Sequence, residues 1–129
     1  MRSEGTERAV LLVEDEWLLR EALATDLREA GWTVLEASTG AGALSALRSN
    51  RKIDVVVTDI QLSGALTGWD IAEAIRDVSN TSIIYTSGNP SNSARRVPGS
   101  IFFKKPYLNA EVIETCQKLR DWKSEARRA

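Results

Sequence analysis

The chain has 129 residues, of which 43% are hydrophobic and 27% are charged, and this balance is typical of one globular domain rather than of a disordered chain. Its formal net charge of −1 gives no general attraction to nucleic acid or to anionic lipid, so we expect neither as a partner. The chain contains no histidine, which excludes a Ser-His-Asp triad, a histidine-activated cysteine and an imidazole-ligated zinc within this polypeptide.

Short apolar runs alternate along the chain with longer segments of helical periodicity, a pattern typical of a parallel sheet covered by helices. The runs predict five strands, at residues 9–13, 33–36, 55–58, 82–86 and 101–103. The longer segments predict helices at residues 17–30, 41–49, 69–77 and 109–123. Because crossovers between parallel strands are right-handed, the helices must cover both faces of the sheet. The predicted fold class is therefore α/β, with a doubly wound parallel sheet of five strands.

The stretch between the fourth and fifth predicted strands has a different composition. Residues 88–100 read GNPSNSARRVPGS, and two prolines with few apolar residues allow only a shortened fourth helix or an irregular loop. We expect this stretch to be mobile. Residues 1–8 and 124–129 are polar, and we expect them to form tails on either side of one domain at residues 9–123.

Polar residues gather at the carboxyl ends of the predicted strands, where doubly wound folds bind their ligands. In chain order these residues are Glu14, Asp15, Asp59, Ser87 and Lys105. Three crowded carboxylates repel one another unless a cation lies among them. Magnesium suits such a site, because it prefers oxygen ligands and is often held by one or two carboxylates together with a phosphate. Helix capping or turn formation could explain each acidic residue singly, but not the lysine and hydroxyl at the neighbouring strand ends.

Four strand-end segments, LLVEDE, VVVTDI, IIYTSG and FFKKPY, match in order and spacing the motifs of response-regulator receiver domains. The chain resembles this CheY-like family over nearly its whole length. The resemblance implies a flavodoxin-like fold with strand order 2-1-3-4-5. It also implies a phosphoprotein of two-component phosphorelay signal transduction, which catalyses its own phosphorylation and dephosphorylation with Mg²⁺ without being an enzyme in the usual sense.

The family's reacting groups can be carried over by motif. Asp59 resembles the phosphoacceptor, and Lys105 resembles the lysine that supplies positive charge to the phosphoryl oxygens. Ser87 resembles the switch hydroxyl, which bonds the phosphoryl group and shifts on activation. Phe102 occupies the family's aromatic switch position, although plain core packing explains it equally well. The bond from Lys105 to Pro106 is expected to be cis, as in the family.

The resemblance also implies a set of magnesium ligands. Asp15 and Asp59 would bind the ion directly, the backbone carbonyl of Gln61 would be a third protein ligand, and Glu14 would act through water. Gln61 and Asn89 lie where the family tunes the rate of dephosphorylation.

Two features depart from the common family pattern. Ser63 stands where the family usually has proline, and the loop LSGALTG is one residue longer than its commonest form. The segment 88–100 resembles that of stand-alone receivers, known mainly from alphaproteobacteria, in which the fourth helix is reduced. Since that helix normally belongs to the output face, the usual mode of dimerisation is not expected here.

We therefore expect a single-domain response regulator that receives its phosphoryl group from a histidine kinase or phosphotransfer protein. It would signal by phosphorylation-dependent interaction with a downstream protein. The alternative is a pseudo-receiver, a binding module that is never phosphorylated, and the presence of every acceptor-site residue argues against it. A phosphatase of the haloacid dehalogenase type needs a second aspartate two positions after the first, where this chain has Gln61.

Other motifs carry weaker signals. Gly40 and Gly42 resemble part of a dinucleotide fingerprint, but Ser45 stands where the third glycine belongs, so they are better explained as helix-start glycines. Cys116 has the helical spacing of a core residue. The four tryptophans, at positions 17, 32, 69 and 122, are expected to be packing residues. Of these, Trp17 is close enough to Asp15 in the sequence to border the pocket as well. A single cysteine and no apolar run near the ~20 residues of a membrane span favour a cytoplasmic protein.

Overall fold

The computed structural model describes residues 7–49, 52–89 and 94–128. Its elements in chain order are β1 (Ala9–Val13), α1 (Trp17–Glu29), β2 (Thr33–Ala37), α2 (Gly40–Ser49), β3 (Val55–Asp59), α3 (Gly68–Val78), β4 (Ser82–Ser87), β5 (Ile101–Lys104) and α4 (Asn109–Arg128). All strand pairs are parallel, and the sheet order is β2-β1-β3-β4-β5. The predicted fold class and strand order are confirmed.

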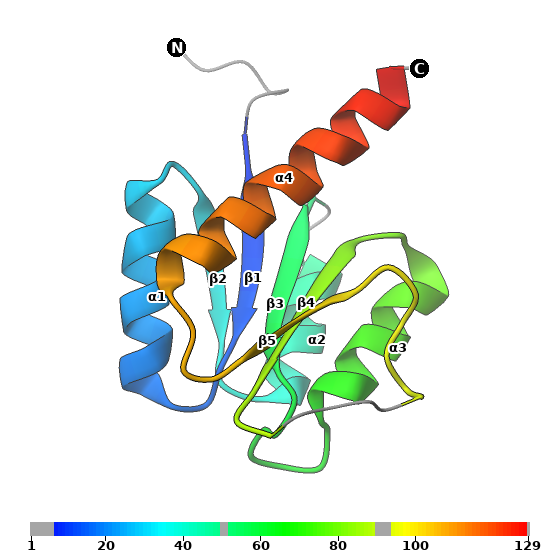
Figure 1. Ribbon diagram of the computed structural model, residues 1–129. Coiled ribbons are helices and arrows are strands. Elements are labelled where there is room, and N and C mark those ends of the chain that lie inside the picture. Colours follow the sequence, from blue (N-terminus) through cyan, green and yellow to red (C-terminus); the bar gives the residue numbers. More distant parts are fainter. Residues whose placement is uncertain (1–6, 50–51, 90–93, 129) are drawn as a thin grey trace.

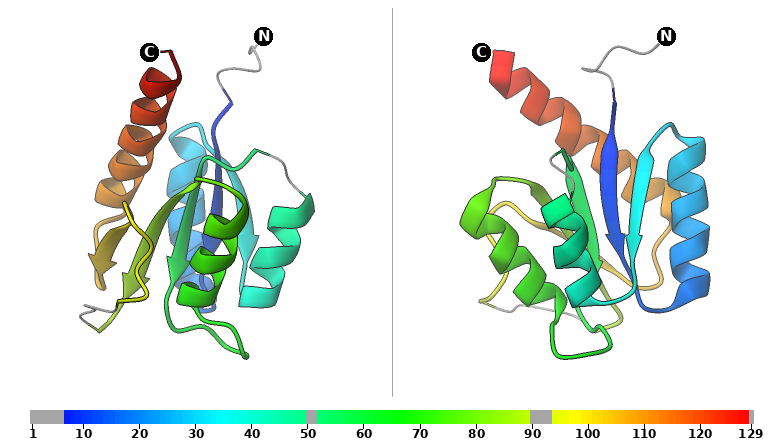
Figure 2. Two further views of the ribbon diagram at one scale, coloured as in Figure 1. Left: turned by 90° about the vertical axis from the view of Figure 1, so that its right-hand side faces the viewer. Right: turned by 180° about the vertical axis from the view of Figure 1, so that it is seen from behind.

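Helices cover both faces of this sheet, α1 and α4 on one side and α2 and α3 on the other (Figures 1 and 2). The two faces follow from the alternation of side chains along the strands. Val10 and Leu12 of β1 pack toward α1 and α4, whereas Leu11 and Val13 pack toward α2 and α3. Strands β3 and β4 are buried along their whole length, which explains why each contains an apolar run with no polar alternation.

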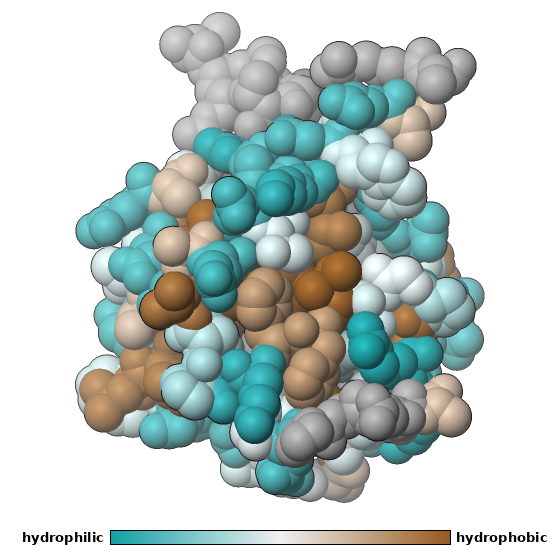
Figure 3. Space-filling model, viewed as in Figure 1, coloured by the Kyte–Doolittle hydropathy of each residue, from teal (hydrophilic) through white to brown (hydrophobic). Residues whose placement is uncertain are grey.

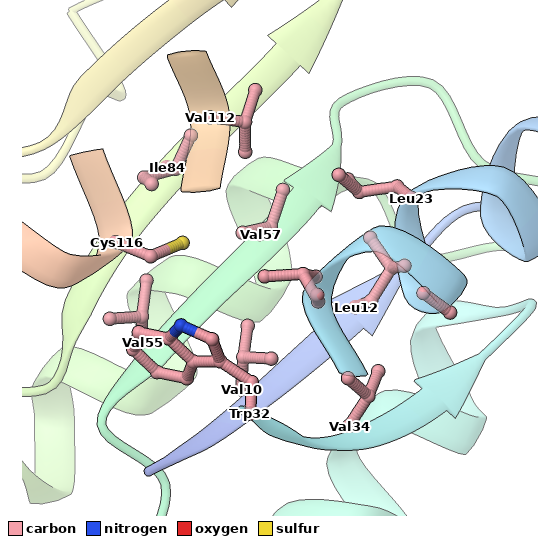
Figure 4. Packing of buried hydrophobic residues seen from close by; sticks show 12 residues of the cluster. Val10, Leu12, Leu23, Trp32, Val34, Val55, Val57, Ile84, Val112 and Cys116 are labelled. Atoms are coloured by element: carbon pink, nitrogen blue, oxygen red, sulfur yellow. The ribbon is translucent and has the colours of Figure 1, made fainter. Parts of the chain in front are cut away.

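The core under α1 and α4 is shown in Figure 4, where Leu23 of α1 and Val112 and Cys116 of α4 surround Val57 of β3. Further out on the same face, partly buried apolar residues pack against this core: Ile101, Phe103, Tyr107, Ile113 and Leu119. Figure 3 shows apolar atoms in the middle of this face, with hydrophilic residues around them. The edge strand β5 is thus covered less completely than the central strands.

Cys116 is fully buried in this core, as its spacing predicted, and burial raises the pKa of its thiol to about 12. Because only the thiolate reacts, about one molecule in ten thousand would be reactive near pH 8. We expect the folded protein to resist a thiol-specific disulfide reagent at that pH, and to consume one equivalent when it is unfolded in urea. Reactivity should rise as the pH approaches 12. Prompt stoichiometric labelling of the folded protein near pH 8 would contradict this prediction.

The last helix is longer than predicted, because α4 continues to Arg128. Residues 124–128, expected to form a polar tail, are therefore helical; alanine, glutamate and arginine there are strong helix formers. At the other end, residues 1–6 of the predicted tail lie outside the described residues. Arg8 already continues the pairing of β1 with β2, since its carbonyl accepts a hydrogen bond from Thr33 N at 2.7 Å.

Between β4 and β5, the described residues 88–89 and 94–100 contain no helix, so the shortened fourth helix expected there is absent from them. Residues 90–93 lie outside the described part of the chain. The segment is instead tied to its surroundings by hydrogen bonds. The buried Val97 donates its backbone N–H to the Tyr85 hydroxyl at 3.2 Å, and the guanidinium of Arg76 donates to the carbonyl of Pro98.

Arg95 adds an ionic contact between this segment and α3. Its guanidinium binds both carboxylate oxygens of Glu73, at 2.8 and 3.0 Å, and Asp70 at 2.8 Å. The bond from the backbone N–H of Thr67, together with the one from Arg95, lowers the pKa of Asp70. This part of the segment, which was expected to be mobile, is therefore held against α3 by Arg95.

The tryptophans fall into two groups. Trp32 is buried, and the ring of Trp69 lies 4.7 Å from that of Tyr85, so both pack as expected. Trp17 and Trp122 are 61% and 66% exposed, and the packing prediction is wrong for them, because each lies on the outward face of its helix. Among the described residues, no helix is both long and apolar enough to span a bilayer.

Candidate functional site

The predicted acidic residues converge where β1 and β3 end. These strands are neighbours, and Val13 pairs with Thr58, so the residues that follow them, Glu14 and Asp59, lie side by side. One carboxylate oxygen from each of Glu14, Asp15 and Asp59 can be chosen so that all three lie within 4.8 Å of one another. Glu14 and Asp59 are buried, whereas Asp15 is exposed. The site therefore has a buried acidic floor and one acidic group at its rim.

Lys105 bridges the two buried carboxylates. Its Nζ atom donates to Glu14 Oε1 at 2.8 Å and to Asp59 Oδ2 at 3.0 Å. Burial raises the pKa of Glu14, and the hydrogen bond from Lys105 only partly offsets that rise. Burial alone would lower the pKa of Lys105, but its bonds to Glu14 and Asp59 outweigh this effect and raise it. Lys105 therefore stays protonated and holds a positive charge against Asp59.

The end of β5 directs this lysine into the site. The backbone N–H of Lys105 donates to the carbonyl of Ser87 at 2.8 Å, and the Lys105–Pro106 bond is cis, as expected. The preceding Lys104 is exposed. Of two adjacent lysines, the resemblance thus selected the one that reaches the carboxylates.

Ser87 ends β4, one strand away from Asp59, and its side chain is buried. The backbone N–H of Asn89 donates to its hydroxyl at 3.1 Å. Phe102 of β5 pairs with Tyr85 of β4 and is partly buried in the core beneath α2 and α3. Gln61 is exposed in the loop that follows Asp59. Ser87 thus ends the strand beside Asp59 and Gln61 follows Asp59 by two residues, whereas Phe102 lies on the next strand, in the core.

Gly68, the first residue of α3, packs against the end of β3 without any signal in the sequence for this contact. A Cβ atom there would lie 2.4 Å from the carbonyl oxygen of Asp59 and 2.8 Å from Ile60 Cα. Helix α3 begins with a capping box, in which Thr67 and Asp70 exchange hydrogen bonds. The TxxD spacing could have revealed the cap, but no local signal reveals the close approach to Asp59.

The loop between β3 and α3 also holds the exposed carboxylate of Asp15. Ser63 donates to Asp15 Oδ2 from its backbone N–H at 3.2 Å and from its hydroxyl at 2.9 Å. The three clustered carboxylates form an oxygen-only donor set, which fits a hard divalent cation such as magnesium better than a softer metal.

Comparison with known proteins identifies relatives of the chain. The family model of the response regulator receiver domain matches residues 10–120. The aerobic respiration control protein ArcA of Escherichia coli is 32% identical over 115 residues, which cover 85% of this chain and 47% of that protein. The probable transcriptional regulatory protein TcrX of Mycobacterium tuberculosis is 37% identical over 75 residues, 58% of this chain and 31% of TcrX. The chain thus spans only about a third to a half of these curated relatives.

Solved structures agree with this result. A response regulator receiver protein from Sinorhizobium medicae has a TM-score of 0.85 and 33% identity, covering 92% of this chain and 98% of that one. The response regulator TrrA of Thermotoga maritima, in complex with Mg²⁺-BeF, has a TM-score of 0.79 and 27% identity, with coverage of 87% and 98%. The structural similarity therefore extends over most of the chain.

Proposed function

The chain belongs to the family of response regulator receiver domains, whose model covers residues 10–120, and we propose that it is a phosphoryl-accepting switch with Asp59 as the acceptor. The observation that carries the proposal is the contact of Lys105 with Asp59, at 3.0 Å, within a cluster of three carboxylates. A lysine held against a buried strand-end aspartate is suited to a reaction in which negative charge arrives on that aspartate.

In the proposed reaction, a carboxylate oxygen of Asp59 attacks the phosphorus of a phosphohistidine on a kinase or phosphotransfer protein. The new O–P bond forms as the P–N bond breaks, and the imidazole leaves with the electron pair. Lys105 offers its charge to the phosphoryl oxygens. Magnesium, held by Asp15, Asp59 and the carbonyl of Gln61, with Glu14 acting through water, would neutralise part of the charge on those oxygens. The chain would not be an enzyme in the usual sense, because it is itself the phosphorylated product.

The conformational change proposed to follow phosphorylation is a shift of the Ser87 hydroxyl toward the phosphoryl group. The hydroxyl of Ser87 accepts one hydrogen bond, from Asn89 N, and a phosphoryl oxygen would be a stronger partner for its proton. Phe102 on the neighbouring strand is only partly buried, which leaves room for its ring to follow. The surface beside β4 and β5 would change in this way and recruit a downstream protein.

A phosphodonor protein must reach Asp59 from the carboxyl edge of the sheet. Trp17 and Leu18, at the start of α1, are 61% and 63% exposed, and such large apolar side chains at a rim favour protein contact. The Sinorhizobium medicae protein, of which this chain covers 98%, supports a receiver that works as a single domain. We place the protein in the cytoplasm, where phosphodonor proteins of this kind act.

Beryllofluoride separates this proposal from a pseudo-receiver that is never phosphorylated. With magnesium present, beryllofluoride should change the tryptophan fluorescence of the protein, because Trp17 lies two residues from Asp15 and is exposed. Magnesium with fluoride but without beryllium is the control, and Trp17→Phe should remove most of the signal. If beryllofluoride leaves the fluorescence unchanged, the pseudo-receiver is the better description.

A further inference from the structure

We infer that Ser63 is a positioning residue for magnesium, acting through Asp15. Both hydrogen bonds from Ser63, the one from its N–H at 3.2 Å and the one from its hydroxyl at 2.9 Å, end on Asp15 Oδ2. The other oxygen, Oδ1, takes no part in them, and we take it as the oxygen that would bind a metal ion. This inference rests on the proposed function, since it takes Asp15 as a metal ligand.

Asp15 needs such a partner more than the other acidic residues do. Lys105 orients Glu14 and Asp59, and both are buried. Asp15 is exposed, so an unrestrained side chain would occupy several rotamers, and binding a metal would have to select one of them. Two hydrogen bonds on one oxygen restrict that choice before the metal arrives. Partners of this kind typically contribute about 10-fold to 100-fold to metal affinity.

Ser63 is itself held in place, so it can orient Asp15 rather than follow it. It forms an isolated parallel bridge with Thr39, which lies between β2 and α2. The next residue, Gly64, has φ of 97°, a conformation that glycine adopts without strain. The chain then enters the capping box of α3 at Thr67. The loop from Ser63 to Thr67 is therefore held by the bridge to Thr39 at one end and by the cap of α3 at the other. This places the Ser63 hydroxyl against the Asp15 carboxylate.

The test is a titration with magnesium chloride alone, followed by tryptophan fluorescence or by calorimetry. Ser63→Ala removes the hydroxyl bond and keeps the backbone one, so we expect the magnesium dissociation constant to rise about 10-fold. Ser63→Thr keeps the hydroxyl and should restore most of the affinity. Ser45→Ala, the same change at an exposed position on α2, should bind magnesium as the wild type does.

A structural role alone would give a different result. We expect Ser63→Ala and wild type to have the same urea midpoint in EDTA and to separate only when magnesium is added. Equal magnesium affinity of Ser63→Ala and wild type would overturn the inference, as would a loss of affinity in Ser63→Thr equal to that in Ser63→Ala. Failure of the wild type to bind magnesium would instead refute the metal site on which the proposed function depends.

Discussion

Asp59→Asn is expected to abolish phosphorylation completely, the largest effect predicted for this protein. With acetyl phosphate and magnesium, the wild type should gain ~80 Da, the mass of one phosphoryl group on one carboxylate. The asparagine amide is a poor nucleophile, so no phosphoryl group should be transferred to residue 59 of the variant.

Mass spectrometry of the intact protein measures this outcome, and a peptide map locates the modified residue. Asp77→Asn is the matched control, because it makes the same chemical change at an exposed position of α3, and it should gain mass as the wild type does. Retention of the ~80 Da gain by Asp59→Asn would move the acceptor to another residue. The absence of any gain in the wild type would favour the pseudo-receiver.

Lys105→Met is expected to destabilise the metal-free protein and to tighten its binding of magnesium. The change leaves two buried carboxylates without their shared cation, and the loss of one partner from a buried ionic pair typically costs about 3–5 kcal/mol. We expect the lower end of that range, since the Lys105 side chain is still 20% exposed. Magnesium should bind more tightly because a competing positive charge has been removed from Glu14 and Asp59.

Urea denaturation in EDTA and in saturating magnesium measures both effects on the Lys105 variant. Lys104→Met, at the exposed neighbouring position, is the matched control and should differ little from the wild type in either condition. The destabilisation of Lys105→Met should shrink when magnesium is present. If the Lys105 and Lys104 variants unfold at the same urea concentration in EDTA, the lysine does not stabilise the acidic cluster in the way the geometry implies.

Local patterns in the sequence were enough to predict the five strands and the polar residues at their carboxyl ends, whereas the strand order came from the family resemblance. Strands buried on both faces must be continuous apolar runs, and β1 was predicted to the residue. Residues that follow parallel strands must meet at one edge of the sheet, so Asp59, Glu14 and Lys105 were grouped correctly. The segment 88–100 was also identified as unusual from its prolines alone, although not as a segment that packs against α3.

Other features depend on residues that are far apart in the chain, and periodicity and propensity carry no information about such pairs. Ser63 and Asp15 are 48 positions apart, and Arg95 and Asp70 are 25 apart, so neither contact leaves a local signal. The close approach of Gly68 to Asp59 exists only because α3 folds back onto β3. The sequence determined which groups could do the chemistry at Asp59. Only the tertiary structure decided which of them touch, because contact depends on how the loops return to the sheet.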